Sequence, residues 1–274
     1  MPKVVKRTVK KAPRRAELEL AWPTDGIKIN LYGRSGTGKT TLWATFPKPI
    51  LALVCSGGKH PGELRSVNTP AYRKVITPLA ITKSTDIHDL LEQDRPSEFA
   101  TVVLEHASGL QDLVLKEILN LDELPAQSSW GLATQGDWGQ CALQMKEILR
   151  ALLSLPNHIV IVAQERDFNS DTTNDVLMPY VASALSPSVV GWLNPACDYI
   201  CQTFIRKRME TKTVKIGAKT KQVTRPGKGV EYCLRTAPDD VYTTKFRIPR
   251  GGIVLPEVIV DPTFEKINRL INQG

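Results

Sequence analysis

One run of residues has the types and the spacing that bind a polyphosphate. It consists of Gly33, Arg34, Ser35, Gly36, Thr37, Gly38, Lys39 and Thr40, in the P-loop pattern G-x-x-x-x-G-K-T. Glycines let the backbone turn so tightly that several N–H groups point at one phosphate group. Lys39 brings a positive charge to the β- and γ-phosphates, and the hydroxyl of Thr40 is a ligand for Mg²⁺. We predict that these residues, with Thr41 after them, bind a nucleoside triphosphate and Mg²⁺.

The residues on both sides of this run are those that a P-loop requires. Residues 27–32 alternate apolar and polar side chains like a strand, and residues 41–46 can form a helix that stops at Pro47. The order strand, loop, helix distinguishes a P-loop from a glycine-rich turn that matches the pattern by chance.

Two later apolar runs each end in a polar side chain. Glu105 follows residues 101–104, and Gln164 follows residues 159–163. In P-loop ATPases an acid at the end of a buried strand holds Mg²⁺, so we assign Glu105 this role beside Thr40. Gln164 would sense the γ-phosphate or position the attacking water. The alternatives are an acid exposed at a strand end and an amide that caps one.

The surrounding pattern predicts an α/β fold with a mainly parallel central sheet flanked by helices. Continuous apolar runs at 50–54, 101–104 and 159–163 are typical of strands buried on both faces, and a shorter strand is expected at 73–77. Helices are expected after Ser84, from Ser108 with Gln111 in a capping-box spacing, from Asp137 to Pro156, and from the pair Asp261-Pro262.

Near the C-terminus the pattern changes to that of an antiparallel hairpin. Residues 198–205 and 230–235 resemble its two arms, which flank a basic stretch at 206–228. Within that stretch Gly217, Pro226, Gly227 and Gly229 are expected to mark turns.

The net charge of +8 is concentrated in two segments. Residues 1–15 contain lysines and arginines and no acid, and residues 206–228 contain only Glu210 against their basic residues, so the rest of the chain is acidic. We expect residues 1–22 to form a disordered basic arm before one domain at 23–274. Positive charge confined to two segments favours binding to a nucleic-acid backbone, with a solvated tail and a solvated hairpin as the alternatives.

Composition also excludes several classes of protein. No apolar run reaches a membrane-spanning length, and the basic N-terminus lacks the apolar region of a secretory signal. Five cysteines without a pairing pattern suit a reducing cytoplasm, and Cys197 and Cys201 lack the second pair that a zinc site needs. The sequence has no guanine-reading N-K-x-D run, so ATP rather than GTP is the expected nucleotide. A small-molecule kinase is a further alternative, although no acceptor-binding motif or Arg-rich lid is evident.

In this order the motifs resemble a RecA-like ATPase core. More specifically, the chain is similar over about residues 25–270 to phage nucleotide-binding proteins of the AAA-type group, which include RecA-like single-strand annealing ATPases. The matching segments are Thr40-Thr41-Leu42, Phe46-Pro47-Lys48-Pro49, Asp137-Trp138-Gly139, Leu234-Arg235-Thr236-Ala237-Pro238 and Lys245-Phe246-Arg247.

The resemblance implies an ATP- and Mg²⁺-dependent enzyme of DNA recombination, annealing or repair that binds single-stranded DNA. It also implies a homo-oligomer with the nucleotide at the subunit interface. Lys245 and Arg247 would then reach a neighbour's nucleotide as an arginine finger does, although alone they would be two surface cations.

The chain departs from this pattern at the residue that activates water. RecA-like enzymes usually have a glutamate at the end of the strand after the P-loop helix, but here that strand continues into Val54-Cys55-Ser56-Gly57-Gly58. Glu63 is nearby but outside the motif, and His106 follows Glu105 where a serine is common. A non-hydrolysing nucleotide-binding module that switches protein assembly is therefore the alternative.

Overall fold

The computed structural model describes residues 26–55, 62–122, 133–168, 180–216, 219–248 and 254–272. The expected basic arm at 1–22 and the strand-end residues Ser56-Gly57-Gly58 lie outside these ranges. Among the described helices, none has the length and apolar character needed to cross a membrane.

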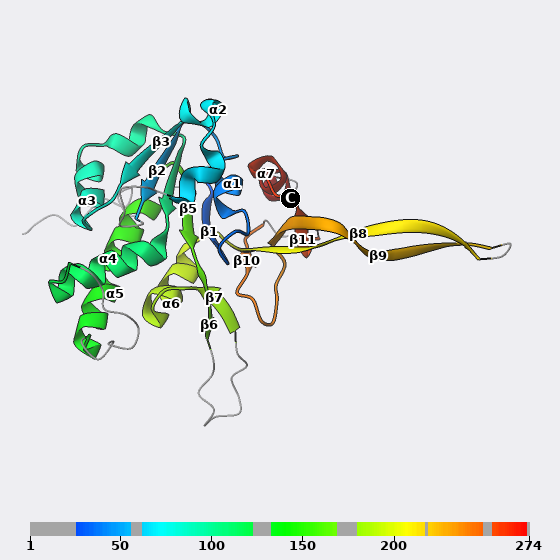
Figure 1. Ribbon diagram of the computed structural model, residues 1–274. Helices are drawn as coiled ribbons and strands as arrows, with labels where there is room; N and C mark the ends of the chain where they lie inside the picture. The colour runs from blue at the N-terminus through cyan, green and yellow to red at the C-terminus, as the bar shows by residue number, and fades with distance from the viewer. Residues whose placement is uncertain are drawn as a thin grey trace, which may run out of the picture.

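Helices and strands alternate along most of the chain before the antiparallel strands begin (Figure 1). The elements are β1 (Lys28–Gly33), α1 (Lys39–Trp43), β2 (Ile50–Val54), η2 (Gly62–Val67), α2 (Pro70–Arg73), β3 (Ile76–Ala80), α3 (Thr85–Glu92), η3 (Arg95–Glu98), β4 (Thr101–Glu105), α4 (Ala107–Leu119), α5 (Gln135–Leu153), β5 (His158–Ala163), β6 (Glu165–Phe168), β7 (Tyr180–Ser183), α6 (Pro187–Ala196), β8 (Tyr199–Ile216), β9 (Lys219–Arg235), β10 (Lys245–Phe246), β11 (Val258–Val260) and α7 (Phe264–Asn272).

One large sheet organises the described residues, with strand order β11-β9-β8-β1-β5-β4-β2-β3 and with β10 paired to β8. The strands from β8 to β3 are parallel, whereas β9, β10 and β11 pair antiparallel. The P-loop strand β1 lies between β8 and β5, and β5 separates it from β4. The chain thus has the predicted RecA-like α/β fold with antiparallel C-terminal strands.

The continuous apolar runs are explained by burial of both faces of the sheet. In β2, Leu51 and Leu53 pack into one core while Ile50, Ala52 and Val54 pack into the other. Helices α4, α5 and α6 cover the first face, and α1 and α7 cover the second (Figure 1). Since each buried aliphatic side chain contributes roughly 1.5–3 kcal/mol, these strands are held firmly.

The predicted start of α4 is wrong in its details. Its N-cap is His106, whose Nδ1 accepts a hydrogen bond from the Gly109 N–H at 2.8 Å, so Ser108 and Gln111 do not form a capping box. The Ser108 hydroxyl instead accepts from the Gln164 N–H at 3.3 Å, and the Gln111 amide oxygen accepts from the Ser186 N–H at 2.6 Å. Tertiary partners replace the local ones that the spacing suggested.

Other boundaries differ by a few residues. The strand expected at 73–77 begins at Ile76, because residues 70–73 form α2. Ser84 is the N-cap of α3, although its hydroxyl bonds to Glu117 rather than to the helix. Helix α7 begins at Phe264, two residues after the predicted Pro262, and the Thr263 hydroxyl accepts from the Lys266 N–H at 3.3 Å.

The basic stretch is itself part of a long two-stranded ribbon. Strands β8 and β9 pair from Gln202–Arg235 out to Ile216–Lys219, and the ribbon extends away from the body of the molecule (Figure 1). Pro226, Gly227 and Gly229 do not form the expected turn, since they lie in β9 where the register shifts between Lys207 and Met209. The predicted turn at Gly217 lies outside the described residues.

A side chain crosses over one glycine of this irregularity. A Cβ on Gly227 would lie 2.4 Å from the Glu210 carboxylate on the opposite strand. Pro226 pairs with Met209 directly beside the register shift, and bulges are among the places where a sheet tolerates proline.

Helix α5 begins at Gln135 with a capping box, two residues before the predicted start at Asp137. The Thr134 hydroxyl accepts from the Asp137 N–H at 3.2 Å, and the Asp137 carboxylate accepts from the Thr134 N–H at 2.7 Å.

We expect Thr134→Ala to lower the free energy of unfolding by about 1 kcal/mol, because the Asp137 N–H group loses its partner. Urea unfolding would measure this, with Thr134→Ser as the matched control that keeps the hydroxyl. Equal losses in both variants would contradict the assignment.

Candidate nucleotide-binding site

The P-loop occupies the turn from the end of β1 to the start of α1. Gly36 and Gly38 have φ angles of 80° and 88°, in the left-handed region that favours glycine. The space above Gly36 is open, whereas a Cβ on Gly38 would lie 3.0 Å from the ring of Tyr232. The loop therefore faces a cavity on one side and the β9 strand on the other.

Lys39 lies at the centre of this loop. Its ammonium donates to the carbonyl oxygens of Gly33 at 2.6 Å and Arg34 at 2.7 Å, and it lies 3.4 Å from the Gln164 amide oxygen. Burial lowers the pKa of Lys39, while the carboxylates of Glu105 and Glu165 oppose that shift. A buried cation in this position is compensated best by an anion in the loop.

Glu105 completes β4 and is 2% exposed. Its Oε2 accepts a hydrogen bond from the indole N–H of Trp43 at 2.5 Å. Burial raises the pKa of Glu105 to about 7, and the Glu63 charge adds to that rise while Trp43 and Lys39 oppose it. A divalent cation would offset the same desolvation cost, because it stabilises the charged carboxylate. The glutamate is therefore not the exposed strand-end acid of the alternative reading.

Gln164 directly follows β5, the strand between β1 and β4. Its side chain therefore lies between the P-loop and Glu105, and its amide oxygen is the one near Lys39. The strand order explains why the ends of three strands that are distant in sequence meet at one edge.

A cavity of about 830 Å³ opens at this edge. Its lining includes Ser35, Gly36, Thr37, Gly38, Lys39, Thr40 and Thr41 from the predicted set, together with Glu105 and Gln164. Gly33 and Arg34 lie behind the cavity, where their carbonyls hold Lys39. The volume, and the charged and hydroxyl groups within the lining, fit a nucleoside triphosphate.

Several lining residues were not predicted as site residues. Glu63, Arg65 and Ser66 enter from η2, Tyr232 enters from β9, and Asp261, Pro262 and Thr263 enter from the segment before α7. Tyr232 is almost two hundred residues from the P-loop in sequence, and no spacing motif connects them. Only the three-dimensional pairing of β9 with β8 brings its ring to Gly38.

The P-loop is also bonded to the base of the ribbon. The Thr37 and Thr203 hydroxyls lie 2.6 Å apart, and Thr203 is a residue of β8. On the same side, the Arg34 guanidinium pairs with Glu165 at 2.6 Å, and Glu165 accepts from the Gln202 amide at 3.1 Å. Both strands of the ribbon therefore contact the loop, β8 through Thr203 and β9 through Tyr232.

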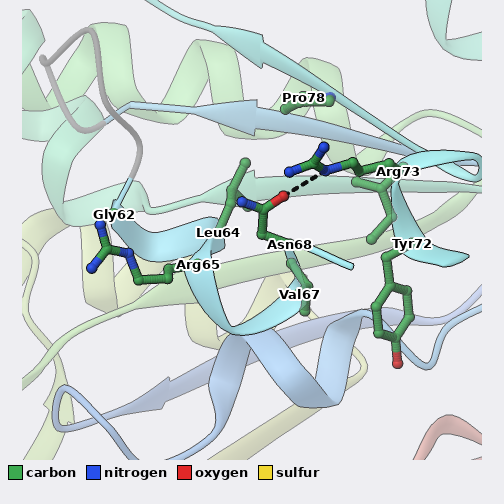
Figure 2. Close-up of a pocket in the computed structure, with 9 residues that line it drawn as sticks. Gly62, Leu64, Arg65, Val67, Asn68, Tyr72, Arg73 and Pro78 are labelled. Atoms are coloured by element: carbon green, nitrogen blue, oxygen red, sulfur yellow. Dashed lines mark hydrogen bonds between the residues drawn. The ribbon is translucent and has the colours of Figure 1, made fainter. Parts of the chain in front are cut away.

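A second hollow of about 450 Å³ lies beside the first (Figure 2). It shares Gly62 and Arg65 with the nucleotide cavity but has no P-loop residue in its lining. Figure 2 shows the Arg73 guanidinium bonded to the Asn68 side chain across this hollow, at 2.7 Å. We therefore assign the nucleotide to the P-loop cavity alone.

Lys245 and Arg247 lie away from their own chain's P-loop. Strand β10 pairs with the first two residues of β8, Tyr199 and Ile200, whereas Gly33 pairs with β8 at Thr203. The Lys245 ammonium donates to carbonyl oxygens at the end of α6, those of Asn194, Pro195 and Cys197. Arg247 pairs with Asp198 at 2.9 Å. Within one chain both cations bind the carboxyl end of α6, and a role in trans remains a prediction.

The residues present fit Mg²⁺ and a nucleoside triphosphate. The loop and Lys39 would hold the phosphates, and Thr40 with Glu105 would supply the hydroxyl and carboxylate oxygens that Mg²⁺ accepts. When bound, the metal ion would neutralise charge between the β- and γ-phosphates.

The pKa of Glu105 generates a prediction about pH. Below pH 7 the protonated carboxyl competes with Mg²⁺, so the Mg²⁺ concentration for half-maximal nucleotide binding should rise by up to about tenfold per pH unit. Magnesium titrations of a fluorescent ATP analogue above and below pH 7 would measure this. Glu105→Gln should need more Mg²⁺ and lose the pH dependence; an unchanged dependence in that variant would assign the titration to another group.

Comparison with known proteins identifies the family of the chain. The AAA domain family matches residues 25–248, and no curated protein matches the chain. Similar solved structures include the flagellar accessory protein FlaH from Methanocaldococcus jannaschii, with 11% identity, a TM-score of 0.36, and coverage of 87% of this chain and 90% of that one. A KaiC-like protein from Pyrococcus horikoshii OT3 has 12% identity, a TM-score of 0.36, and coverage of 84% and 94%. Because the family match spans most of its length, including the whole P-loop, the chain belongs to the AAA domain family of P-loop proteins.

Proposed function

We propose that the chain is an ATP-dependent enzyme that binds single-stranded DNA and acts in recombination, annealing or repair. The observation that carries this proposal is the attachment of a basic two-stranded ribbon directly to the P-loop. ATP would bind in the cavity at Gly33–Thr41 with Mg²⁺ on Thr40 and Glu105, and the DNA backbone would bind along the ribbon.

The charge of the ribbon supports DNA as the partner. Arg206, Lys207, Arg208, Arg225 and Lys228 are all exposed, and of these Arg206 pairs with Glu231 at 3.0 Å. The sequence adds four lysines nearer the tip. Since the chain outside this stretch and residues 1–15 is acidic, a polyanion would be attracted to this element and repelled from the acidic part. The 206–228 stretch has no aromatic residue for base stacking, so backbone charge would dominate binding.

The contacts between ribbon and P-loop support coupling of the two sites. A phosphate in the loop would change the environment of Thr37, and Thr37 shares a hydrogen bond with Thr203 at the base of the ribbon. If nucleotide changes DNA affinity by this route, DNA must change nucleotide affinity by the same factor. A change in nucleotide affinity when DNA is added is the expected outcome.

We also propose that the protein acts as a homo-oligomer with the nucleotide at the interface between subunits. Lys245 and Arg247 would then leave the α6 carbonyls and approach the neighbour's γ-phosphate. The exposed ring of Tyr232 at the rim of the cavity, 44% accessible, suits a surface that a second subunit covers.

A second candidate function is a non-hydrolysing nucleotide switch for protein assembly. It is favoured by the end of β2, where Val54 is followed by a buried cysteine rather than an acid. Burial raises the pKa of Cys55 to about 12, so its thiol stays protonated at neutral pH and does not replace a carboxylate.

Steady-state ATP hydrolysis with and without single-stranded DNA tests these two functions against each other. We expect Mg²⁺-dependent turnover that rises with DNA and is abolished in Lys39→Ala, because that variant loses the charge on the phosphates. ATP binding that depends on Lys39 without any turnover would instead establish the switch.

The ribbon model predicts a steep dependence of DNA affinity on salt. The double variant Lys207→Ala with Lys228→Ala should make the salt dependence shallower. The negative slope of log affinity against log salt should lose about 1.4 in magnitude, since each phosphate contact on single strands contributes about 0.7. Fluorescence anisotropy with labelled DNA would measure the slope. The matched control is Lys74→Ala with Lys83→Ala, two exposed lysines on the body. Equal slopes in both double variants would show that the ribbon does not bind the DNA backbone.

A further inference from the structure

Hydrolysis at the proposed site needs a group that orients water and accepts its proton. Lys39 and Glu105 are committed to the phosphates and the metal ion, and the amide of Gln164 orients water without accepting a proton. His106 uses its Nδ1 to cap α4 and does not line the cavity. The residues assigned so far therefore leave this role unfilled.

Glu63 lies on the same cavity as these residues. It is the second residue of η2, which packs against α1, the helix that follows the P-loop. In a 3₁₀-helix, side chains three residues apart share one side, and both Glu63 and Ser66 line the cavity together with Lys39 and Glu105. The side chain thus reaches the phosphate site from a different element than the strand end where an acid was expected.

The carboxylate of Glu63 has an unsatisfied oxygen. Its Oε2 is buried and has no hydrogen-bond partner among the described residues. A buried charged oxygen without a partner is costly, so a water molecule or a ligand is expected to bind it. The Glu63 charge also raises the pKa of Glu105 and opposes the fall in the pKa of His106, which places the carboxylate near the end of β4.

We infer that Glu63 is the catalytic carboxylate that holds the attacking water and takes its proton. The water oxygen forms a bond to the γ-phosphorus while the bond from that phosphorus to the β–γ bridging oxygen breaks. One water proton passes to Glu63, and ADP and inorganic phosphate leave. This inference rests on the proposed ATPase function and deepens it, because it supplies the acid that the end of β2 lacks.

The test compares Glu63→Gln with the wild-type protein, using a fluorescent ATP analogue for binding and phosphate release for turnover. Glutamine keeps the size and a hydrogen-bonding oxygen but does not accept the proton. We expect nucleotide affinity and the Mg²⁺ requirement to stay within about threefold, while kcat falls by about 10²–10⁴-fold. Glu92→Gln, an exposed glutamate on α3, is the matched control and should leave kcat unchanged.

Three results would overturn the inference while the ATPase stands. They are turnover in Glu63→Gln within threefold of wild type, recovery of its turnover at higher Mg²⁺, which would make Glu63 a metal ligand, and a loss of nucleotide binding equal to the loss of turnover. Lys39-dependent ATP binding without turnover in the wild-type protein would overturn the ATPase itself and the role of Glu63 with it.

Discussion

Burial of both faces of the parallel strands is the constraint on which the site depends. Because β1, β4 and β5 are covered by helices on each side, they stay parallel and in fixed register, and their carboxyl ends meet at one edge. The polar residues that follow them then occupy set positions. Strand order alone places these groups: Lys39 lies beyond β1, Gln164 beyond the neighbouring strand β5, and Glu105 at the end of β4 on the far side of β5.

Desolvation makes the charged forms of Lys39 and Glu105 costly unless a partner compensates them. Lys39 is stabilised by carbonyl oxygens of its own loop, and Glu105 by an indole N–H. Neither partner fully compensates a buried charge, so both groups are poised for a ligand of opposite sign. A polyphosphate with a divalent cation satisfies both at once, since the anion faces the lysine and the cation faces the carboxylate.

The sequence predicted the parts of this site that depend on local pattern or on strand order. The P-loop, the strand that ends at Glu105 and the strand before Gln164 follow from spacing and from continuous apolar runs. The cap of α4 was mistaken, because Ser108 and Gln111 form tertiary hydrogen bonds that outweigh the local ones. The start of α7 was placed two residues too early, because Thr263 rather than Asp261 accepts from an N–H of its first turn. Tyr232 could not be identified from the sequence, since its place depends on the pairing of distant strands. Glu63 was noted only as an acid near the motif, since the short 3₁₀-helix that brings it to the cavity has no periodicity to reveal it.

The bulge between Lys207 and Met209 divides the ribbon into two parts with different freedoms. On the side of the body, a shift by one residue would turn Tyr232 to the other face and remove it from Gly38. Beyond the bulge no such register is imposed by the nucleotide site. The outer part can therefore lengthen, shorten or change its charge without moving Tyr232 and Thr203 away from the P-loop.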